Sequence, residues 1–246
     1  MTMENNTPFK SELIDSLKKH LAETPPDVFQ AEWDEIVKLY PEDRTSNKKV
    51  GLYFGSFNPV HVGHLVQAES VLNSGLVDEI WFILSPHNPV KNLADLATFE
   101  HRFTMLSMAT YNNPKFIVSK IEQDIYGLGE KSYSYKTLEV LSEMYPAIDF
   151  GIIMGSDTFA GIRNWKNYKW IVENFHLLLV NRLPDIITDE MCKFDFIPKE
   201  LCVIKDAPTI GISSTYVRKL IHDNKSVNYV VRDSVASYIK IHQLYF

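Results

Sequence analysis

The stretch from Val50 to Leu65, which reads VGLYFGSFNPVHVGHL, decides the fold. It begins with an apolar run that ends at Phe54 and has the length and the β-branched or aromatic character of a buried strand. Residues 55–59 then favour a tight turn, and residues 62–74 show the apolar spacing of a helix. Such an arrangement brings free backbone N–H groups and the positive end of the helix dipole to one point. The stretch therefore predicts a phosphate-binding site.

Two histidines in this stretch strengthen the prediction. His61 and His64 are three positions apart, so they share a face in the first turn of a helix. Imidazole donates hydrogen bonds in both its neutral and its charged form. A lone histidine here would more often be a cap or a solvent-facing residue, but the pair directly after a Gly-Ser-Phe-Asn-Pro turn favours anion binding.

A second anion-binding pattern lies near the C-terminus. Residues 212–218 read ISSTYVR and begin a predicted helix. Hydroxyl groups and backbone N–H groups at a helix N-terminus bind anions, and an arginine one turn further on adds charge. By itself the pattern is typical of a serine N-cap beside a surface arginine. Together with the histidine pair it indicates a nucleotide-binding site.

Composition limits the class of protein. The 246 residues are 45% hydrophobic and 23% charged, which is ordinary for a globular protein with a sizeable core. The net charge of −6 disfavours a general nucleic-acid binder. No apolar run approaches the ~20 residues that a transmembrane helix needs, and the N-terminus does not resemble a signal peptide. We expect a cytoplasmic protein without membrane contact, in which Cys192 and Cys202 are reduced thiols.

The first 48 residues are expected to form a helical extension. Residues 9–22 and 28–40 each show an amphipathic stripe, and Pro25 and Pro26 separate them. An amphipathic helical hairpin needs a surface to cover, and the nearest one is the main domain, residues 49–246. The alternative role of the hairpin is an oligomer contact or a lid, so a homo-oligomer is one of the expected possibilities.

The main domain alternates between predicted strands and helices. Strands are expected at 50–54, 78–84, 116–118, 150–154, 176–180 and 201–204. Helices are expected at 62–74, 99–112, 132–145, within 165–174, at 212–222 and at 233–242. This alternation predicts an α/β fold, a Rossmann-like doubly wound parallel sheet with a C-terminal helical tail. Residues 183–199 are expected to be irregular. Ligand contacts belong at the carboxyl ends of the strands, where His87, Lys91 and Arg102 form a local basic cluster.

The run from Gly55 to His64, Gly-Ser-Phe-Asn-Pro-Val-His-Val-Gly-His, resembles the signature of the nucleotidyltransferases that carry a (His/Thr)-x-Gly-His motif. Within that superfamily the chain is similar to the bacterial nicotinate-nucleotide adenylyltransferases, from about Val50 to the C-terminus. Residues 212–218 resemble the Ile-Ser-Ser-Thr-x-x-Arg signature of the same family. The family commonly has Gly-Gly-Thr-Phe-Asp-Pro at the turn, so Ser56 and Asn58 depart from its pattern, and the spelling found here also occurs in the nicotinamide mononucleotide branch.

The resemblance implies roles for individual residues. Catalysis would rest on His61, His64 and Arg218, with His64 at the α-phosphate. ATP would be bound by Gly55, Ser56, Phe57, His61, His64, Gly155, Asp157, Ile212, Ser213, Ser214, Thr215 and Arg218. The mononucleotide would be bound by Asn58, His87, Lys91, Arg102, Ser132, Tyr133, Ser134 and Trp165. In the family a tryptophan stacks on the pyridine ring and backbone amides near the Ser-Tyr pair receive the carboxylate. Arg102 is about as well explained by a solvated basic loop, and Trp165 by core packing. Asp157 is also explained by a helix N-cap.

The reaction that the resemblance implies is adenylyl transfer from ATP to nicotinate mononucleotide, giving deamido-NAD and pyrophosphate. Mg²⁺ is expected to arrive on ATP through phosphate oxygens, and no protein metal site is expected. Nicotinamide mononucleotide and phosphopantetheine remain alternative acceptors. A nucleotide-binding sensor without turnover is an alternative from another class, and so is a class I aminoacyl-tRNA synthetase, for which the chain is short and insufficiently basic.

Overall fold

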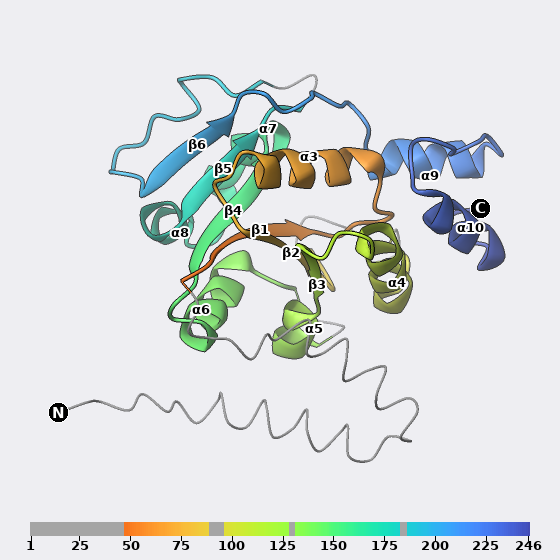
Figure 1. Cartoon of the computed structure of the whole chain (residues 1–246), viewed down its shortest axis with the longest axis horizontal. Helices are drawn as coiled ribbons and strands as arrows, with labels where there is room; N and C mark the ends of the chain where they lie inside the picture. Colours follow the sequence, from red (N-terminus) through yellow and green to blue (C-terminus); the bar gives the residue numbers. More distant parts are fainter. Residues whose placement is uncertain (1–46, 89–95, 128–130, 183–185) are drawn as a thin grey trace, which may run out of the picture.

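The computed structural model describes residues 47–88, 96–127, 131–182 and 186–246. They form a six-stranded parallel sheet with helices on both faces (Figure 1). The strands are β1 (Lys49–Gly55), β2 (Glu79–Leu84), β3 (Phe116–Ser119), β4 (Asp149–Gly155), β5 (His176–Val180) and β6 (Glu200–Ile204). The helices are α3 (Val62–Asn73), α4 (Phe99–Thr110), α5 (Ile121–Tyr126), α6 (Ser134–Met144), α7 (Ser156–Ala160), the 3-10 helix η2 (Ile162–Asn164), α8 (Tyr168–Asn174), α9 (Ser214–His222) and α10 (Asp233–Ile241).

The strand order is β3-β2-β1-β4-β5-β6, so the chain winds outward from β1 in both directions. On one side β1 pairs with β2, where Gly55 is opposite Leu84. On the other side it pairs with β4, where Leu52 is opposite Ile152. The order reverses between β1 and β4, and a doubly wound sheet binds ligands in the crevice at that point. The predicted Rossmann-like fold is confirmed.

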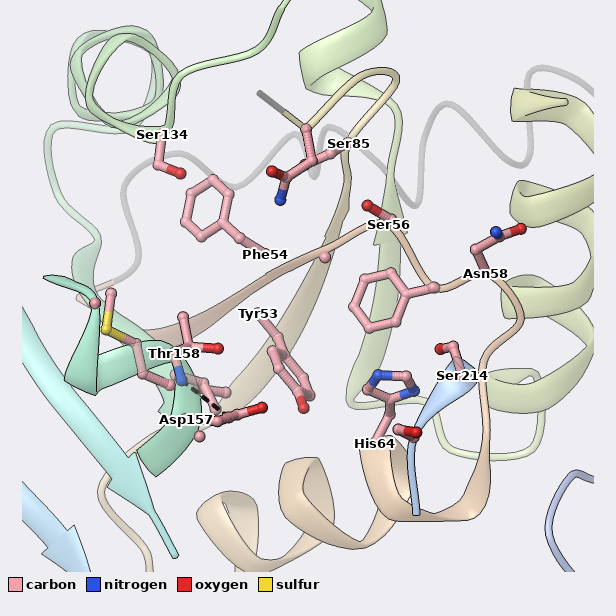
Figure 2. A pocket seen from close by; sticks show the side chains of 18 of the residues that line it. Tyr53, Phe54, Ser56, Asn58, His64, Ser85, Ser134, Asp157, Thr158 and Ser214 are labelled. Atoms are coloured by element: carbon pink, nitrogen blue, oxygen red, sulfur yellow. Dashed lines mark hydrogen bonds between the residues drawn. The ribbon is translucent and has the colours of Figure 1, made fainter. Parts of the chain in front are cut away.

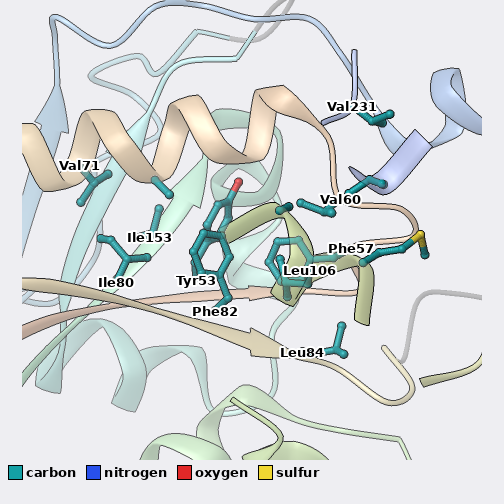
Figure 3. Packing of buried hydrophobic residues seen from close by; sticks show 14 of the residues in the cluster. Tyr53, Phe57, Val60, Val71, Ile80, Phe82, Leu84, Leu106, Ile153 and Val231 are labelled. Atoms are coloured by element: carbon teal, nitrogen blue, oxygen red, sulfur yellow. The ribbon is translucent and has the colours of Figure 1, made fainter. Parts of the chain in front are cut away.

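Two apolar layers enclose the sheet, because both faces of a parallel sheet are covered by helices. Along β1 the side chains alternate between the faces: Tyr53 belongs to the layer under α3, and Leu52 belongs to the opposite layer. Figure 3 shows Tyr53 and Phe82 of the sheet packed together with Phe57 beneath α3. The opposite layer takes side chains from α6 and α8, which lie across the sheet from α3 (Figure 1).

The C-terminal helices α9 and α10 form the predicted helical tail. Val62, the first residue of α3, donates its backbone N–H to the carbonyl of Val230 at 2.9 Å. The Tyr245 hydroxyl donates to Asn58 Oδ1 at 2.7 Å. The tail is therefore bonded directly to the turn between β1 and α3.

Two short helices, α5 and α7, are present that the sequence did not predict. α5 has six residues and α7 has five, which is too short for a helical hydrophobic pattern to emerge. Helix α6 begins two residues later than its predicted start at Ser132. Ser132 donates its N–H to the carbonyl of His87, and Tyr133 is extended, so the helix begins at Ser134.

The two predicted N-terminal helices, 9–22 and 28–40, lie outside the described residues. The extension 1–48 therefore stays a prediction. Within the described ranges, no helix is both long enough and apolar enough to cross a bilayer.

Candidate active site

A pocket of about 950 Å³ opens at the carboxyl ends of β1 and β4, at the reversal of strand order. Its wall takes residues from the turn after β1, the start of α3, the start of α6, the turn after β4 and the start of α9. Figure 2 shows His64 and Ser214 facing the pocket from one side and Ser134 from the other. The two predicted anion motifs, 148 or more positions apart in the chain, thus share one cavity.

The turn after β1 is held in an unusual shape. Phe57 has a positive φ of 41°, and the Asn58–Pro59 peptide bond is cis. The Phe57 ring folds back over Gly55, where a Cβ atom would lie 2.9 Å from a ring carbon. Gly55 is therefore required by close packing, which also lets the ring line the pocket.

The histidine pair sits at the start of α3. His61 is the N-cap residue, and its ring stacks on the ring of His64 with centroids 3.6 Å apart. The backbone N–H of His61 donates to Nδ1 of His64 at 3.2 Å. Since Nδ1 accepts, the proton of a neutral His64 is on Nε2, the nitrogen left for a ligand. The two side chains lie on one face at the start of α3, as predicted.

Burial favours the neutral form of both imidazoles. Burial and, second to it, the charge of Arg182 lower the pKa of His61 to about 3. Burial also holds the pKa of His64 well below its usual range, with contributions from His61 and Arg182. His61 is only 2% exposed, and among the described residues neither of its ring nitrogens has a hydrogen-bond partner. Buried ring nitrogens at a pocket wall fit a ligand that brings polar atoms of its own.

The second motif is bonded to the first. Ser213 caps α9 by accepting from the Tyr216 N–H at 3.1 Å. The Ser214 hydroxyl donates to the carbonyl of Pro59 at 2.9 Å, and Arg218 Nη1 donates to the carbonyl of Asn58 at 2.8 Å. The hydroxyls of Ser213 and Ser214 are therefore used in bonds within the protein. The groups left to face a ligand are the first backbone N–H groups of α9 and the charge of Arg218.

Arg182 is a pocket residue that the sequence analysis missed. Its Nη1 donates to Asp157 Oδ2 at 2.6 Å, and its Nη2 donates to the carbonyl of Ile212 at 2.8 Å. A Cβ on Gly155 would lie 2.6 Å from Asp157 Oδ1, so glycine makes room for that carboxylate. The available signal was a polar residue just past the buried strand β5, at the ligand-binding edge of the sheet.

Asp157 lines the pocket, as predicted, but it is not a helix N-cap. Gly155 is the N-cap of α7, and Asp157 lies in the first turn. Its Oδ1 accepts from the Thr158 N–H at 2.9 Å (Figure 2). The carboxylate is therefore fixed from two sides while it remains at the pocket wall.

The opposite wall holds the predicted mononucleotide contacts Ser132, Tyr133, Ser134 and Trp165. The Tyr126 hydroxyl donates to the carbonyl of Tyr133 at 2.7 Å, which fixes the chain just before α6. Trp165 also packs against the apolar layer beneath it, so core packing and pocket lining both apply. Lys166, which sequence reasoning missed, lines the pocket beside it.

Arg102 does not lie at the pocket, where it was expected. It is 1% exposed, and its guanidinium donates to four backbone carbonyls, those of Ala97, Ser56, Ser85 and Pro86, at 2.7 to 3.0 Å. With its donors used in this way, Arg102 does not line the pocket. It ties the turn after β1 to the loop after β2, and this placement does not support the predicted contact with substrate.

Two other predicted contact residues, Asn58 and His87, are held by bonds within the protein. The side-chain oxygen of Asn58 accepts from the Ala97 N–H at 3.0 Å and from Tyr245 at 2.7 Å, so it is engaged by the protein although Asn58 borders the pocket. His87 offers its backbone carbonyl to Ser132, but its neighbour Asn88, not its own ring, lines the pocket. Lys91 lies outside the described residues.

Comparison with known proteins agrees with this geometry. The family model described as cytidylyltransferase-like matches residues 52–220. A probable nicotinate-nucleotide adenylyltransferase of Cytophaga hutchinsonii is 36% identical over 197 residues, which are 80% of this chain and 98% of the relative. One of Flavobacterium johnsoniae is 37% identical over the same shares. The fold also matches the Plasmodium falciparum nicotinic acid mononucleotide adenylyltransferase complexed with APC, with a TM-score of 0.68 and 22% identity over 80% of this chain and 97% of that one.

The parallel sheet and the two helix N-termini that meet at its reversal point define an α/β nucleotidyltransferase. The family match spans both anion motifs, and the relatives are matched over nearly their whole length. The chain therefore belongs to the cytidylyltransferase-like family and, within it, to the nicotinate-nucleotide adenylyltransferases.

Proposed function

We propose that this protein transfers the adenylyl group of ATP to nicotinate mononucleotide, releasing pyrophosphate and forming deamido-NAD. The observation that carries the proposal is the meeting, in one pocket, of the histidine pair of α3 and Arg218 of α9 with an aromatic wall at Tyr133 and Trp165. The names of the relatives point to the same reaction.

The chemistry needs positioning and charge more than it needs a base. The phosphate of the mononucleotide is ionised at neutral pH, so one of its oxygens attacks the α-phosphorus of ATP without losing a proton. The bond from that phosphorus to the bridging oxygen of pyrophosphate then breaks in line with the attack. Hydrogen-bond donors placed where charge develops on the phosphoryl oxygens lower the barrier.

We assign Nε2–H of His64 to the α-phosphate, because its other nitrogen already accepts from the backbone. Arg218 and the first N–H groups of α9 would hold the β- and γ-phosphates. Arg182 is paired with Asp157 and stands next to both motifs. That pair would keep the pocket centre close to neutral while the arginine orients the chain at Ile212.

Mg²⁺ would enter with ATP. Within the described ranges, no group of three or more histidine, cysteine or acidic side chains is arranged to hold a metal ion. The neutral donors and arginines found here suit a magnesium–nucleotide whose metal is held by phosphate oxygens. The metal would supply charge neutralisation at the phosphates.

Pyrophosphate release by the purified protein tests the proposal. With ATP and Mg²⁺, we expect release with nicotinate mononucleotide to exceed release with nicotinamide mononucleotide. Release with the amide alone would keep the transfer chemistry and overturn the acceptor. Pyrophosphate release with phosphopantetheine alone would overturn the proposal, and so would the absence of release with all three acceptors.

A further inference from the structure

Among the described residues, four charged side chains line the pocket: Asp157, Lys166, Arg182 and Arg218. Asp157 and Arg182 form an ion pair at 2.6 Å. Arg218 points toward the anion motifs, where it donates to the carbonyl of Asn58. Lys166 has no carboxylate partner in the part of the chain that the structure describes. It therefore brings an uncompensated positive charge to the pocket.

Lys166 lies on the aromatic side of the pocket, away from the phosphate motifs. Its Nζ is 4.8 Å from the ring centroid of Tyr133 and 5.6 Å from that of Tyr135. It directly follows Trp165, whose backbone N–H is bonded to Ile162 at 2.9 Å. Cation–π attraction to the two tyrosines thus keeps the ammonium group beside the wall where a pyridine ring would stack.

An aromatic wall alone does not distinguish an acid from an amide, because nicotinate and nicotinamide rings present the same flat face to it. The two substituents differ by one negative charge. A cation at the rim of the ring site attracts the carboxylate by a charge-assisted hydrogen bond, which the neutral carboxamide does not form.

We propose that Lys166 is a specificity-determining residue that pairs with the ring carboxylate of the mononucleotide and makes the site favour the acid over the amide. This inference rests on the proposed function and adds a charged group to the backbone amides that the family resemblance assigns to the carboxylate. Because the lysine is exposed and screened by solvent, we expect a preference of roughly three- to fivefold from this one charge.

The test compares kcat/KM for the two mononucleotides at saturating ATP in the wild type, in Lys166→Met and in Lys166→Arg. Lys169→Met is the matched control. Lys169 lies in the next helix, is exposed, stacks over Phe196 and does not line the pocket. We expect Lys166→Met to lose roughly three- to fivefold with the acid and less than twofold with the amide. Lys166→Arg should keep most of the preference, and the control should match the wild type.

Equal losses with both acceptors would overturn the proposal, since they would mean that Lys166 holds the mononucleotide phosphate or the local fold. Unchanged acid preference in Lys166→Met would overturn it as well. If the wild type itself shows no preference for the acid, the role of Lys166 falls while adenylyl transfer stands. If the wild type uses neither mononucleotide, both proposals fall.

Discussion

Replacing His64 with alanine separates a catalytic role from a structural one. The side chain makes one polar contact in the described structure, the 3.2 Å bond from the His61 N–H to Nδ1. Its ring also stacks on His61 and meets the edge of Phe57 with centroids 5.1 Å apart. The nitrogen assigned to the substrate, Nε2, has no part in these contacts.

The two effects have different sizes. Losing the capping bond costs about 1 kcal/mol, and removing a partly buried ring adds about 1–2 kcal/mol. A domain with a typical stability of about 5–15 kcal/mol stays folded after such a loss. Losing one donor to a developing phosphoryl charge costs about 2.7–4 kcal/mol in the transition state, or roughly a 10²–10³-fold drop in kcat.

The assay pairs urea unfolding with steady-state pyrophosphate release from nicotinate mononucleotide. His222→Ala is the control, because His222 is an exposed histidine in the last turn of α9. We expect the control to match the wild type in both measurements. A His64→Ala protein that loses stability in proportion to activity, or that keeps kcat within tenfold of the wild type, would refute the assignment of Nε2 to the α-phosphate.

Three further predictions concern the residues around the pocket. Arg102→Met removes the donor from four backbone carbonyls, and the bonds to Ser85 and Pro86 are buried. The variant should lower the free energy of unfolding by about 2 kcal/mol or more, whereas the exposed control Arg163→Met should change it by less than about 1 kcal/mol. Equal urea midpoints for the two variants would contradict the structural role of Arg102. Burial and the charge of Arg182 lower the pKa of His61 to about 3, so below pH 6.5 the unfolded chain binds a proton at this residue and the folded protein does not. The free energy of unfolding should be constant above pH 7 and lower by about 2 kcal/mol at pH 5 from this residue alone. A His61→Asn variant whose free energy of unfolding falls with the same slope in acid would rule this out. Burial raises the pKa of Glu122, against the opposing hydrogen bonds of Ser132, Ser85 and Thr137. Folding therefore favours the neutral carboxyl, and the stability that comes from binding this proton is lost as pH rises. Glu122→Gln should be more stable relative to the wild type at pH 8 than at pH 5, and a parallel pH dependence of the two free energies of unfolding would disprove this role of Glu122.

The strand and helix order was predictable because it depends on local patterns. The apolar runs that became β2, β4 and β5 are nearly continuous, as expected for strands covered on both faces. The turn residues around Gly55 and the serines before α9 marked the two anion sites for the same reason. Whether the protein forms a homo-oligomer stays a prediction, which light scattering on the purified chain would test.

Charge type, by contrast, did not predict placement. Arg102 and Arg182 are both arginines near predicted loops, yet one is buried among carbonyls and the other lines the pocket. The same holds for Asn58, whose oxygen is taken by a tyrosine 187 positions away. A guanidinium or an amide finds its partner through contacts between distant segments, and no local spacing records them.

The sequence by itself determined the parallel α/β architecture, the two anion motifs and the family, since these depend on the order of residues along short stretches. Only the tertiary structure decided that the histidines are stacked, that Arg102 supports the turn, and that Lys166 lies at the aromatic wall. Protonation, partner choice and exposure depend on which segments pack together, and packing brings together atoms that the chain order keeps far apart.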